Sequence, residues 1–417
     1  MGLFEELQWR GLVHDFTDPV VPEKLNAGGL TAYIGFDPTA DSLHIGNLLQ
    51  ICNLRRLQEA GHQVIALTGG ATGMIGDPGG RSDERSLLSS DELSTNIAGV
   101  RAQLERYVLP GAIFEDNREW LQEVSVLDFL RDVGKHFTVN QMVAKESVRS
   151  RFEGHDRGIS YTEFSYMLLQ AADYLHLFDT HGCDLQLGAS DQWGNIVMGI
   201  ELIRKVRSRS VYGFTCPLVL KPDGTKFGKS VDGAVWLDAK RTSPYAMYQF
   251  FVRSEDSVVG TYLRYYTWLD QERIEELDGA TRDHPERREA QRALAWEVTA
   301  LVHDRAEADK ATHASGVLFS EEIASLDEAT LVDVFAEAPS TTLGREPIAL
   351  VDVLASSGLA KSKSDARRHL EAGAVHVNNR KVADVDAKLD PVTDSLHGRY
   401  VVLRRGKAAQ HLLRFEG

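Results

Sequence analysis

Short apolar runs alternate with longer amphipathic stretches over roughly the first half of the chain. The runs TAYIGF (31–36), QVIALTGG (63–70), AIFEDN (112–117) and CDLQLGAS (183–190) have the length and composition of buried strands. The stretches between them have helical spacing, and this alternation predicts an α/β fold with a Rossmann-like, doubly wound parallel sheet. Ligands bind at the carboxyl ends of the strands in such sheets, so the loops after these runs are the first candidates for a site.

The pattern changes in the second half. Between residues 243 and 318 the apolar spacing is helical and strand signals fade, which predicts a mainly α-helical domain. The segment AEAPSTTLGREP (336–347) is rich in Pro, Ser and Thr, as is typical of a linker. After it, residues 348–373 predict two short helices, and AVHVNNRKV (374–382) predicts a hairpin around Asn378 and Asn379. We therefore expect a Rossmann-like catalytic domain over 1–222, a loop and α-helical domain over 223–325, a linker over 326–347 and a small α+β domain over 348–417.

Composition narrows the class of protein. No apolar run approaches the roughly 18 residues that a membrane span needs, and the first residues lack the layout of a signal peptide. The three cysteines, Cys52, Cys183 and Cys216, are scattered, so neither a disulfide framework nor a zinc cluster is expected. These features predict a reduced, cytoplasmic protein with no membrane association and no metal cluster.

The charge is unevenly distributed. The net charge of −15 argues against a non-specific nucleic-acid binder. Residues 348–417, however, carry 12 Lys and Arg against 8 Asp and Glu, whereas the rest of the chain carries 34 against 53. We expect any nucleic-acid contact to be at least partly the work of this C-terminal segment.

The first candidate site is HIGN (44–47), at the start of a predicted helix over 43–60 that follows a strand and a turn. Asp41 or Ser42 is the expected N-cap, and the free N–H groups and dipole of a helix start suit a phosphate. His44 and Asn47 share one face, and Gly46 leaves room for a ligand at the backbone. Taken alone, the tetrapeptide fits a capped surface helix equally well.

The second candidate is KPDGTKFGKSVDG (221–233). Lys226 and Lys229 form a cationic pair in a glycine-rich loop, which suits a polyphosphate whose charge grows during transfer. An isolated KxxKS sequence is more often a solvated basic turn.

The third candidate is a polar stripe in SYMLLQAADYL (165–175). Tyr166, Gln170 and Asp173 fall at i, i+4 and i+7 of a predicted helix whose opposite arc is apolar. Such a stripe either faces water or lines a polar pocket, and the pattern alone leaves both open. Asp191 and Gln192 follow a predicted strand at its carboxyl edge, where a tight turn is the simpler alternative.

Together these motifs resemble those of a known family. HIGN resembles the HIGH signature of class I aminoacyl-tRNA synthetases, and KFGKS (226–230) resembles their KMSKS loop. GATGMIGDPGGRSDER (70–85), YTEFSYMLLQAADY (161–174) and LQLGASDQWGN (185–195) extend the resemblance to the bacterial tyrosyl-tRNA synthetases over almost the whole length. The last 70 residues resemble the S4-type RNA-binding module of that family.

The resemblance implies a two-step ligase. L-Tyrosine reacts with Mg²⁺-bound ATP to give tyrosyl-adenylate and pyrophosphate, and the tyrosyl group then passes to the 3′-terminal ribose of tRNA(Tyr). The resemblance also implies a homodimer whose interface lies near residues 115 to 180, roughly. A tryptophanyl-tRNA synthetase, a small-molecule nucleotidylyltransferase and an inactive RNA-binding relative are the alternatives. Tyr33, Asp173 and the S4-like tail favour the tyrosine enzyme.

The resemblance also implies roles for single residues. Tyr33 and Asp173 bind the phenol of the substrate tyrosine, and Gln192 reaches the carboxylate of that tyrosine. Its ammonium group is surrounded by Tyr166, Gln170 and Asp77. Arg81 and Arg85 help pyrophosphate to leave. The remaining nucleotide contacts are Thr39, His44, Lys226 and Lys229 for the pyrophosphate, Asn47 and Asp191 for the ribose, and Gly35, Asp37 and Gly46 for ATP more generally.

Four positions depart from the family pattern. Asn47 replaces the second His of HIGH, and we expect its amide N–H to serve as the donor instead. Phe227 and Gly228 replace Met and Ser of KMSKS, and Ala189 stands where the family commonly has Gly. Phosphate contacts with tRNA are expected from Arg204, Lys205, Arg207 and Arg209, and in the C-terminal module from Lys361, Lys363, Arg367, Arg368, Arg380 and Lys381.

Overall fold

The computed structural model describes residues 2–77, 89–145, 148–149, 159–220, 227, 229–230, 233–336, 338–406 and 409–416. Its contacts divide the chain into two compact units. Unit 1 comprises residues 1–242 with 255–290, and unit 2 comprises 243–254 with 291–417. The domain boundaries expected from the sequence stay predictions. Among the described residues we find no helix whose length and hydropathy would let it cross a membrane.

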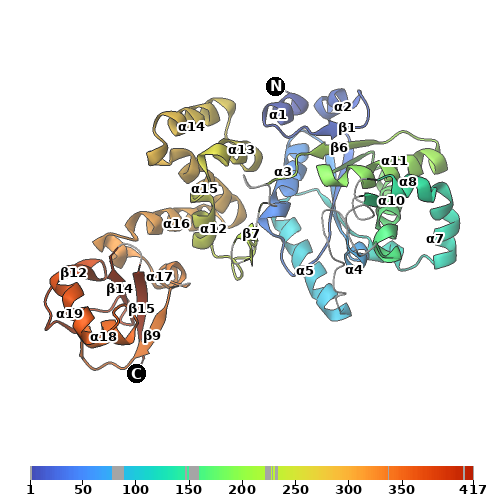
Figure 1. Ribbon diagram of the computed structural model, residues 1–417. Coiled ribbons are helices and arrows are strands. Elements are labelled where there is room, and N and C mark those ends of the chain that lie inside the picture. The colour runs from blue at the N-terminus through green and yellow to red at the C-terminus, as the bar shows by residue number, and fades with distance from the viewer. Residues whose placement is uncertain are drawn as a thin grey trace. The chain divides into compact units, whose positions relative to one another are not determined.

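Unit 1 is built on a six-stranded sheet (Figure 1). Strands β2 (Thr31–Phe36), β3 (Gln63–Thr68), β4 (Ile113–Asp116), β5 (Leu185–Ala189) and β6 (Tyr212–Cys216) are parallel, in the order β6-β5-β2-β3-β4. The short β1 (Asp15–Phe16) pairs antiparallel with β6 at one edge. This confirms the doubly wound parallel sheet, and all four predicted strands are present.

The strand order reverses between β2 and β5. The chain runs outward from β2 to β3 and β4, then returns to place β5 on the other side of β2. A crevice opens outside the carboxyl ends of two such strands, since their connections leave in opposite directions. Asp37 and Thr39 follow β2, and Asp191 and Gln192 follow β5.

Helices cover both faces of this sheet. In Figure 1, α3 (Ile45–Glu59) and α5 (Ser90–Tyr107) lie on one side, and α10 (Tyr161–His181) and α11 (Trp193–Arg207) lie on the other. Tyr33 and Ile65 of the sheet share one core cluster with Tyr174, Leu177 and Ile203 of α10 and α11. The unit also contains α1 (Leu3–Trp9), α2 (Val21–Ala27), α4 (Thr72–Ile75), α6 (Arg118–Leu121), α7 (Val126–Asp132), α8 (Val139–Val143), α13 (Asp256–Tyr266) and α14 (Gln271–Asp283).

The helical spacing seen between residues 243 and 318 is confirmed. Besides α13 and α14, it forms α12 (Pro244–Val252), α15 (Glu289–Val302) and α16 (Arg305–Val317). In unit 2, α12 packs against α16 and against α17 (Glu328–Val334). Leu331 and Phe335 are buried beside α16, so this part of the predicted linker is folded.

The C-terminal part of unit 2 is a small α+β module. Its sheet has the order β12-β11-β14-β15-β9, formed by β9 (Ser340–Leu343), β11 (Val375–Val377), β12 (Arg380–Val382), β14 (Tyr400–Arg405) and β15 (Ala409–Phe415). A separate two-stranded pair joins β10 (Ile348–Ala349) and β13 (Lys388–Leu389), and α18 (Leu350–Ser356) and α19 (Lys363–Glu371) pack on each other. Asn378 and Asn379 have φ angles of 47° and 63°, so the predicted hairpin turn is confirmed.

Strand β9 differs from the sequence prediction. It lies within the segment expected to be a linker, yet it pairs in parallel with β15 at the edge of the sheet. Its four residues alternate between exposed and half-buried, and this stretch is too short for its periodicity to stand out.

Candidate active site

The deep end of the predicted tyrosine pocket is organised around Asp173 on α10, which is 2% exposed. Its two carboxylate oxygens accept hydrogen bonds from Asn117 Nδ2 at 2.9 Å and Trp120 Nε1 at 3.0 Å. Burial raises the pKa of Asp173 to about 8, although these two hydrogen bonds oppose the shift. The carboxyl group is therefore held in one orientation and carries a proton more readily than an ordinary aspartate.

Tyr33 on β2 supplies a second polar group in this region. Its hydroxyl is buried, and among the described residues it has no hydrogen-bond partner. Burial, and next the nearby charge of Asp173, hold the pKa of Tyr33 well above its usual value. An unpaired buried hydroxyl is costly, so Tyr33 and Asp173 together present a place that a ligand hydroxyl would complete.

A network of polar side chains continues from this end. Tyr166 Oη donates to Asp37 Oδ2 at 3.1 Å, and Thr72 Oγ1 donates to Asp37 Oδ1 at 2.9 Å. Asn117 Nδ2 also donates to Thr72 Oγ1 at 2.9 Å, which joins this group to Asp173. Asp37, expected from the sequence near ATP, is thus bound to a residue of the tyrosine pocket.

The other predicted pocket residues form a second group. Gln192 Nε2 donates to Asp77 Oδ2 at 2.6 Å, and Asn195 Nδ2 donates to Gln170 Oε1 at 3.0 Å and to Gln192 Oε1 at 3.3 Å. The structure therefore brings Asp77, Gln170 and Gln192 together around Asn195. The stripe predicted on α10 lines this polar network rather than open solvent, while its opposite arc, including Leu168 and Ala171, is packed in the core.

Two glycines after β3 make room for the carboxylates of the neighbouring strands. A Cβ atom on Gly69 would collide with the Asp37 carboxylate, and one on Gly70 would collide with that of Asp116. The Gly70 N–H instead donates to Asp116 Oδ1 at 3.2 Å. This loop needs glycine because Asp37, directly after β2, and Asp116, the last residue of β4, fill the space beside it.

The nucleotide side begins with His44, which is itself the N-cap of α3. Its Nδ1 accepts from the Gly46 N–H at 3.0 Å, and Asn47 Oδ1 accepts from the His44 N–H at 3.2 Å. The expectation that Asp41 or Ser42 caps this helix is wrong. The chain before His44 is held extended instead, since Leu237 N–H donates to the Leu43 carbonyl and Ile45 N–H to the Val235 carbonyl.

Glycine is needed at position 46 for a different reason from the expected one, which was room for a ligand. A Cβ atom there would lie 2.8 and 2.9 Å from two atoms of the His44 ring. Glycine therefore lets the imidazole fold back over the helix start.

Phe227 of the KFGKS motif lies against the same helix start. A Cβ atom on Gly46 would be 3.5 Å from the Phe227 carbonyl oxygen. The Phe227 ring is buried against Tyr262 and Tyr266 of α13, with ring centroids 4.5 and 5.8 Å apart. The His44 ring lies 6.1 Å from the Trp236 ring, just beyond this segment.

Several predicted residues lie outside the described part. Arg81, Arg85 and Lys226 are among them. Lys229 begins β7 (Lys229–Ser230), which pairs with β8 (Gly233–Ala234), but its side chain is also outside the described part.

The remaining predicted nucleotide residues lie at the switch point. Gly35 is exposed on β2, and a Cβ atom there would meet nothing within 4 Å. Thr39 is exposed in the following turn, and Asp191 lies in the 3₁₀ turn η2 (Ser190–Gln192) directly after β5. The carboxyl end of β2 thus offers open backbone at Gly35, and Asp191 supplies a polar side chain after β5.

Sequence reasoning missed four residues of the network: Asn117, Trp120, Thr72 and Asn195. A signal existed for Asn117, because it is the last residue of the predicted strand AIFEDN (112–117), at the carboxyl edge of the sheet where ligands bind. Trp120 and Thr72 lie on four-residue helices, too short to show a periodicity.

The predicted acceptor-stem cluster is largely ion-paired in this structure. Arg204 and Lys205 pair with Glu201 at 2.8 and 3.1 Å, and Arg207 pairs with Asp179 at 2.7 Å. A phosphate would have to replace these carboxylates, so the cluster is weaker than its four positive charges suggest.

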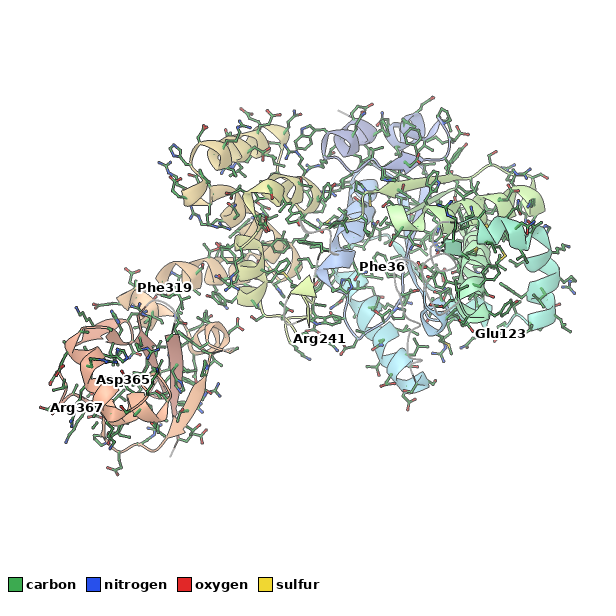
Figure 2. The ribbon with its side chains drawn as sticks, viewed as in Figure 1. Phe36, Glu123, Arg241, Phe319, Asp365 and Arg367 are labelled. Atoms are coloured by element: carbon green, nitrogen blue, oxygen red, sulfur yellow. The ribbon has the colours of Figure 1, made fainter. Side chains whose placement is uncertain are left out.

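The C-terminal candidates are more open. Figure 2 shows Asp365 and Arg367 on α19, where Arg367 is exposed. Lys363 pairs with Asp352 at 2.8 Å, and Arg368 pairs with Asp365.

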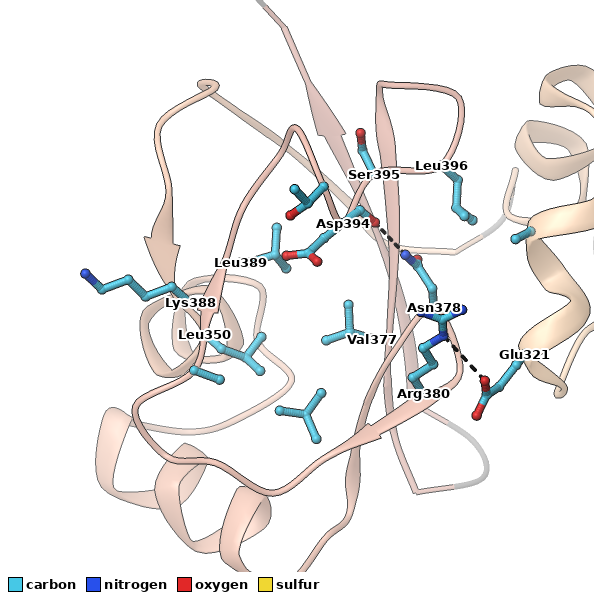
Figure 3. Close-up of a pocket in the computed structure, with 14 residues that line it drawn as sticks. Glu321, Leu350, Val377, Asn378, Arg380, Lys388, Leu389, Asp394, Ser395 and Leu396 are labelled. Atoms are coloured by element: carbon cyan, nitrogen blue, oxygen red, sulfur yellow. Dashed lines mark hydrogen bonds and ion pairs between the residues drawn. The ribbon is translucent and has the colours of Figure 1, made fainter.

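A cavity of about 340 Å³ lies in unit 2 between the β11–β12 hairpin and the β10–β13 pair (Figure 3). Leu350, Val377 and Leu389 form apolar parts of its lining, and Arg380 at its edge pairs with Glu321 at 3.4 Å. None of the predicted tyrosine or ATP residues lines it.

Comparisons with known proteins agree with this geometry. Residues 25–320 match the family of class I tRNA synthetases (W and Y), and residues 330–413 match the C-terminal domain of SYY-like tyrosine–tRNA ligases. The tyrosine–tRNA ligase of Roseiflexus castenholzii is 50% identical over 99% of both chains, and that of Geobacillus kaustophilus is 49% identical over 100% of both. The solved structure of a C-terminally truncated mitochondrial tyrosyl-tRNA synthetase from Aspergillus nidulans has a TM-score of 0.68 and 32% identity, covering 76% of this chain and 94% of its own. This chain belongs to the tyrosine–tRNA ligases within the class I tRNA synthetases.

Proposed function

We propose that unit 1 activates L-tyrosine with Mg²⁺-bound ATP through the residues of the site described above, and that unit 2 helps to hold tRNA(Tyr) during the transfer. The observation that carries the assignment is the buried Tyr33 hydroxyl, which has no hydrogen-bond partner among the described residues and lies near the oriented carboxyl group of Asp173. A substrate phenol has one O–H donor and acceptor lone pairs, so it satisfies both groups at once. Phenylalanine would leave the Tyr33 hydroxyl without a partner and would give Asp173 no further hydrogen bond.

The rest of the pocket suits the amino-acid backbone. Asp77, Tyr166 and Gln170 surround the ammonium group, and Gln192 turns its amide to the carboxylate. In the free protein Gln192 and Asp77 bond to each other, so binding exchanges this contact for contacts with the substrate. Asn195 keeps Gln170 and Gln192 in place meanwhile.

Activation needs no protein nucleophile, because the tyrosine carboxylate attacks the α-phosphorus itself. A carboxylate oxygen forms the new bond to phosphorus, and the bond to the bridging oxygen of pyrophosphate breaks, so that the electron pair leaves with pyrophosphate. Thr39, His44, Lys226 and Lys229, with Arg81 and Arg85, stabilise the leaving group, and Asn47 and Asp191 bind the ribose. Gly35, Asp37 and Gly46 complete the ATP site. Mg²⁺ enters with ATP as part of the substrate, and catalysis is positioning and electrostatic stabilisation.

The transfer step uses both units. The 2′- or 3′-hydroxyl of the terminal ribose attacks the adenylate carbonyl, and AMP leaves. Exposed cations on and beside α19, including Lys361 and Arg367, hold the RNA backbone by contacts that weaken with salt.

A homodimer is part of the proposal. Helix α7 has no buried residue, and Val126 and Leu127 are 74% and 79% exposed. A helix with such an exposed apolar side is stabilised by covering it, and the same surface of a second copy is the simplest cover. We place the protein in the cytoplasm, where its substrates are made.

The test is aminoacylation with the full chain, ATP, Mg²⁺ and labelled tyrosine or tryptophan. We expect tyrosine to be attached to tRNA(Tyr), and this attachment to weaken in an Arg367→Ala/Lys361→Ala double variant far more than pyrophosphate exchange does. Attachment of tryptophan to tRNA(Trp) instead would overturn the assignment. So would a protein that charges neither tRNA.

A further inference from the structure

Helix α13 holds Phe227 of the KFGKS motif through aromatic contacts. The Phe227 ring packs on Tyr262 and Tyr266, one turn apart on this helix. Tyr262 Oη donates to the Leu220 carbonyl at 3.2 Å, just before the segment, and Phe227 N–H donates to the Val219 carbonyl at 3.1 Å. The position of α13 therefore determines where Phe227 lies.

The C-terminal end of α13 is held by two buried arginines from distant parts of unit 1. Arg56, in the last turn of α3, donates from Nη2 to the carbonyls of Tyr265 at 2.8 Å and Thr267 at 3.2 Å. Arg10 donates to the carbonyls of Arg264 at 3.1 Å, Thr267 at 3.2 Å and Leu269 at 3.0 Å.

These contacts suit the chemistry of a helix end. The last carbonyls of an α-helix lack partners within the helix, and the dipole there favours a cation. Arg56 and Arg10 are only 3% and 4% exposed, so both bring their charge out of water to make these bonds. Burial lowers the pKa of Arg56 to about 10, which leaves it charged at neutral pH.

The same helix α3 carries the HIGN residues at its other end. His44 and Asn47 begin it, and Gly46 approaches the Phe227 carbonyl. A continuous set of contacts thus runs from α3 through Arg56 to α13, from α13 through Tyr262 and Tyr266 to Phe227, and from Phe227 back to the start of α3.

We propose that Arg56, assisted by Arg10, is a positioning residue for the activation step: by binding the end of α13 it sets the place of Phe227 relative to HIGN, and so assists the chemistry of the KFGKS lysines. The proposal rests on the function proposed above for these lysines. A residue that only stabilised the fold would affect tyrosine and ATP alike, whereas this one affects the ATP side alone.

The experiment compares Arg56→Met, Phe227→Leu and the double variant by tyrosine-dependent ATP–pyrophosphate exchange. For each single variant, we expect kcat/KM for ATP to fall at least about tenfold, while the Kd for tyrosine measured without ATP stays within about twofold. Because both changes act through one contact path, kcat/KM for ATP in the double variant should be little lower than in the less active single variant. It should not fall by the product of the two single effects. Arg56→Lys keeps the charge and should recover part of the loss.

Arg55→Met is the matched control. Arg55 neighbours Arg56 and also lies over the Trp268 ring, at 4.8 Å, but its ion pair is with Glu59 at 3.9 Å, on its own helix. It should keep kcat/KM for ATP within about twofold of the unchanged protein. If Arg56→Met fails to fold, Arg10→Met replaces it in the same cycle, since it removes bonds to the same end of α13, including one to the shared Thr267 carbonyl.

The outcomes separate the two proposals. An unchanged protein that shows no tyrosine-dependent exchange would refute the proposed function. An active unchanged protein whose Arg56 and Phe227 effects multiply, or whose Arg56→Met variant loses tyrosine binding as strongly as ATP use, would overturn the positioning role alone.

Discussion

Asn47 and His44 hold each other at the start of α3. The Asn47 side-chain oxygen accepts the His44 N–H at 3.2 Å, while the His44 ring accepts the N–H of Gly46 at 3.0 Å. Asn47 thus takes the N3 position of a capping box whose N-cap is His44. Because its oxygen is engaged in this way, its amide nitrogen is the atom left to donate to a nucleotide.

Replacing Asn47 tests whether its side-chain nitrogen donates to the nucleotide while its oxygen caps the helix. Asn47→Ala should lower kcat/KM for ATP in pyrophosphate exchange by about tenfold, since one hydrogen bond of about 1–1.5 kcal/mol is lost. Asn47→His, which restores a ring N–H donor, should recover most of it. KM for tyrosine should not move in either variant, and an Asn47→His enzyme as weak as Asn47→Ala would show that the donor is not what matters.

Tyr33→Phe should have opposite effects on stability and specificity. Removing a buried hydroxyl without a partner should leave the free energy of unfolding unchanged or raise it by about 1 kcal/mol. The kcat/KM for tyrosine should fall about tenfold, while that for phenylalanine should not fall. The preference for tyrosine over phenylalanine, already known to be about 10⁵ for this enzyme family, should therefore decrease.

Tyr174→Phe is its control. The Tyr174 hydroxyl donates to the Tyr212 carbonyl at 2.8 Å, outside the pocket. That variant should lose stability and keep its discrimination. Loss of discrimination in Tyr174→Phe but not in Tyr33→Phe would contradict the pocket assignment.

The raised pKa of Asp173 makes the stability of the free protein depend on pH. The pKa rises from 3.8 to about 8. Below pH 4 the carboxyl is protonated in both states, whereas between pH 4 and 8 only the unfolded state ionises, so stability is lost as the pH rises through this window. Asp173→Asn does not titrate. The free energy of unfolding of the variant minus that of the unchanged protein should therefore increase from pH 4 to pH 8. Each pKa unit corresponds to about 1.4 kcal/mol, so the increase is up to about 5 kcal/mol.

The measurement is denaturant unfolding of both proteins across that range without tyrosine. A difference that stays flat with pH would mean that Asp173 ionises normally in the folded protein.

Lys229→Ala should act on the rate of adenylate formation alone. Loss of one cation from the leaving group predicts a fall of about 10²-fold in the single-turnover rate. Tyrosine affinity, measured by equilibrium dialysis, should be unchanged. Lys240→Ala removes an exposed lysine beyond the KFGKS segment and should leave the rate as it was; a comparable drop there would point to general charge rather than to Lys229.

Leu127→Arg tests the proposed dimer. A charge on this 79% exposed side chain of α7 would have to be buried in the interface. Sedimentation should therefore show a dimer for the unchanged protein and a monomer for the variant. Val392→Arg changes an equally exposed side chain in unit 2 and should remain a dimer. A monomeric unchanged protein would contradict the proposal directly.

The sequence predicts the elements whose pattern is long or strongly alternating, and their order. Strand β2 and helix α10 are evident from apolar runs and from the stripe of Tyr166, Gln170 and Asp173. The partners of Asp173 are not, because Asn117 and Trp120 meet it only after β4 is placed in the sheet. The N-cap of α3 was mispredicted for a similar reason, since the distant residues Val235 and Leu237 hold Leu43 extended.

The hydrogen bonds of Arg10 and Arg56 also could not be predicted from the local sequence. Both read as ordinary surface cations on helices, yet both end in a buried cluster of carbonyl groups. Long-range contacts of this kind depend on tertiary packing and leave no local pattern.

The most direct test of the whole account is ATP–pyrophosphate exchange without tRNA, run against each of the twenty amino acids. We expect exchange with tyrosine and, at a far lower level, with phenylalanine alone among the others. Exchange driven by tryptophan would contradict the roles of Tyr33 and Asp173. No exchange with any amino acid would mean that the HIGN site does not support activation.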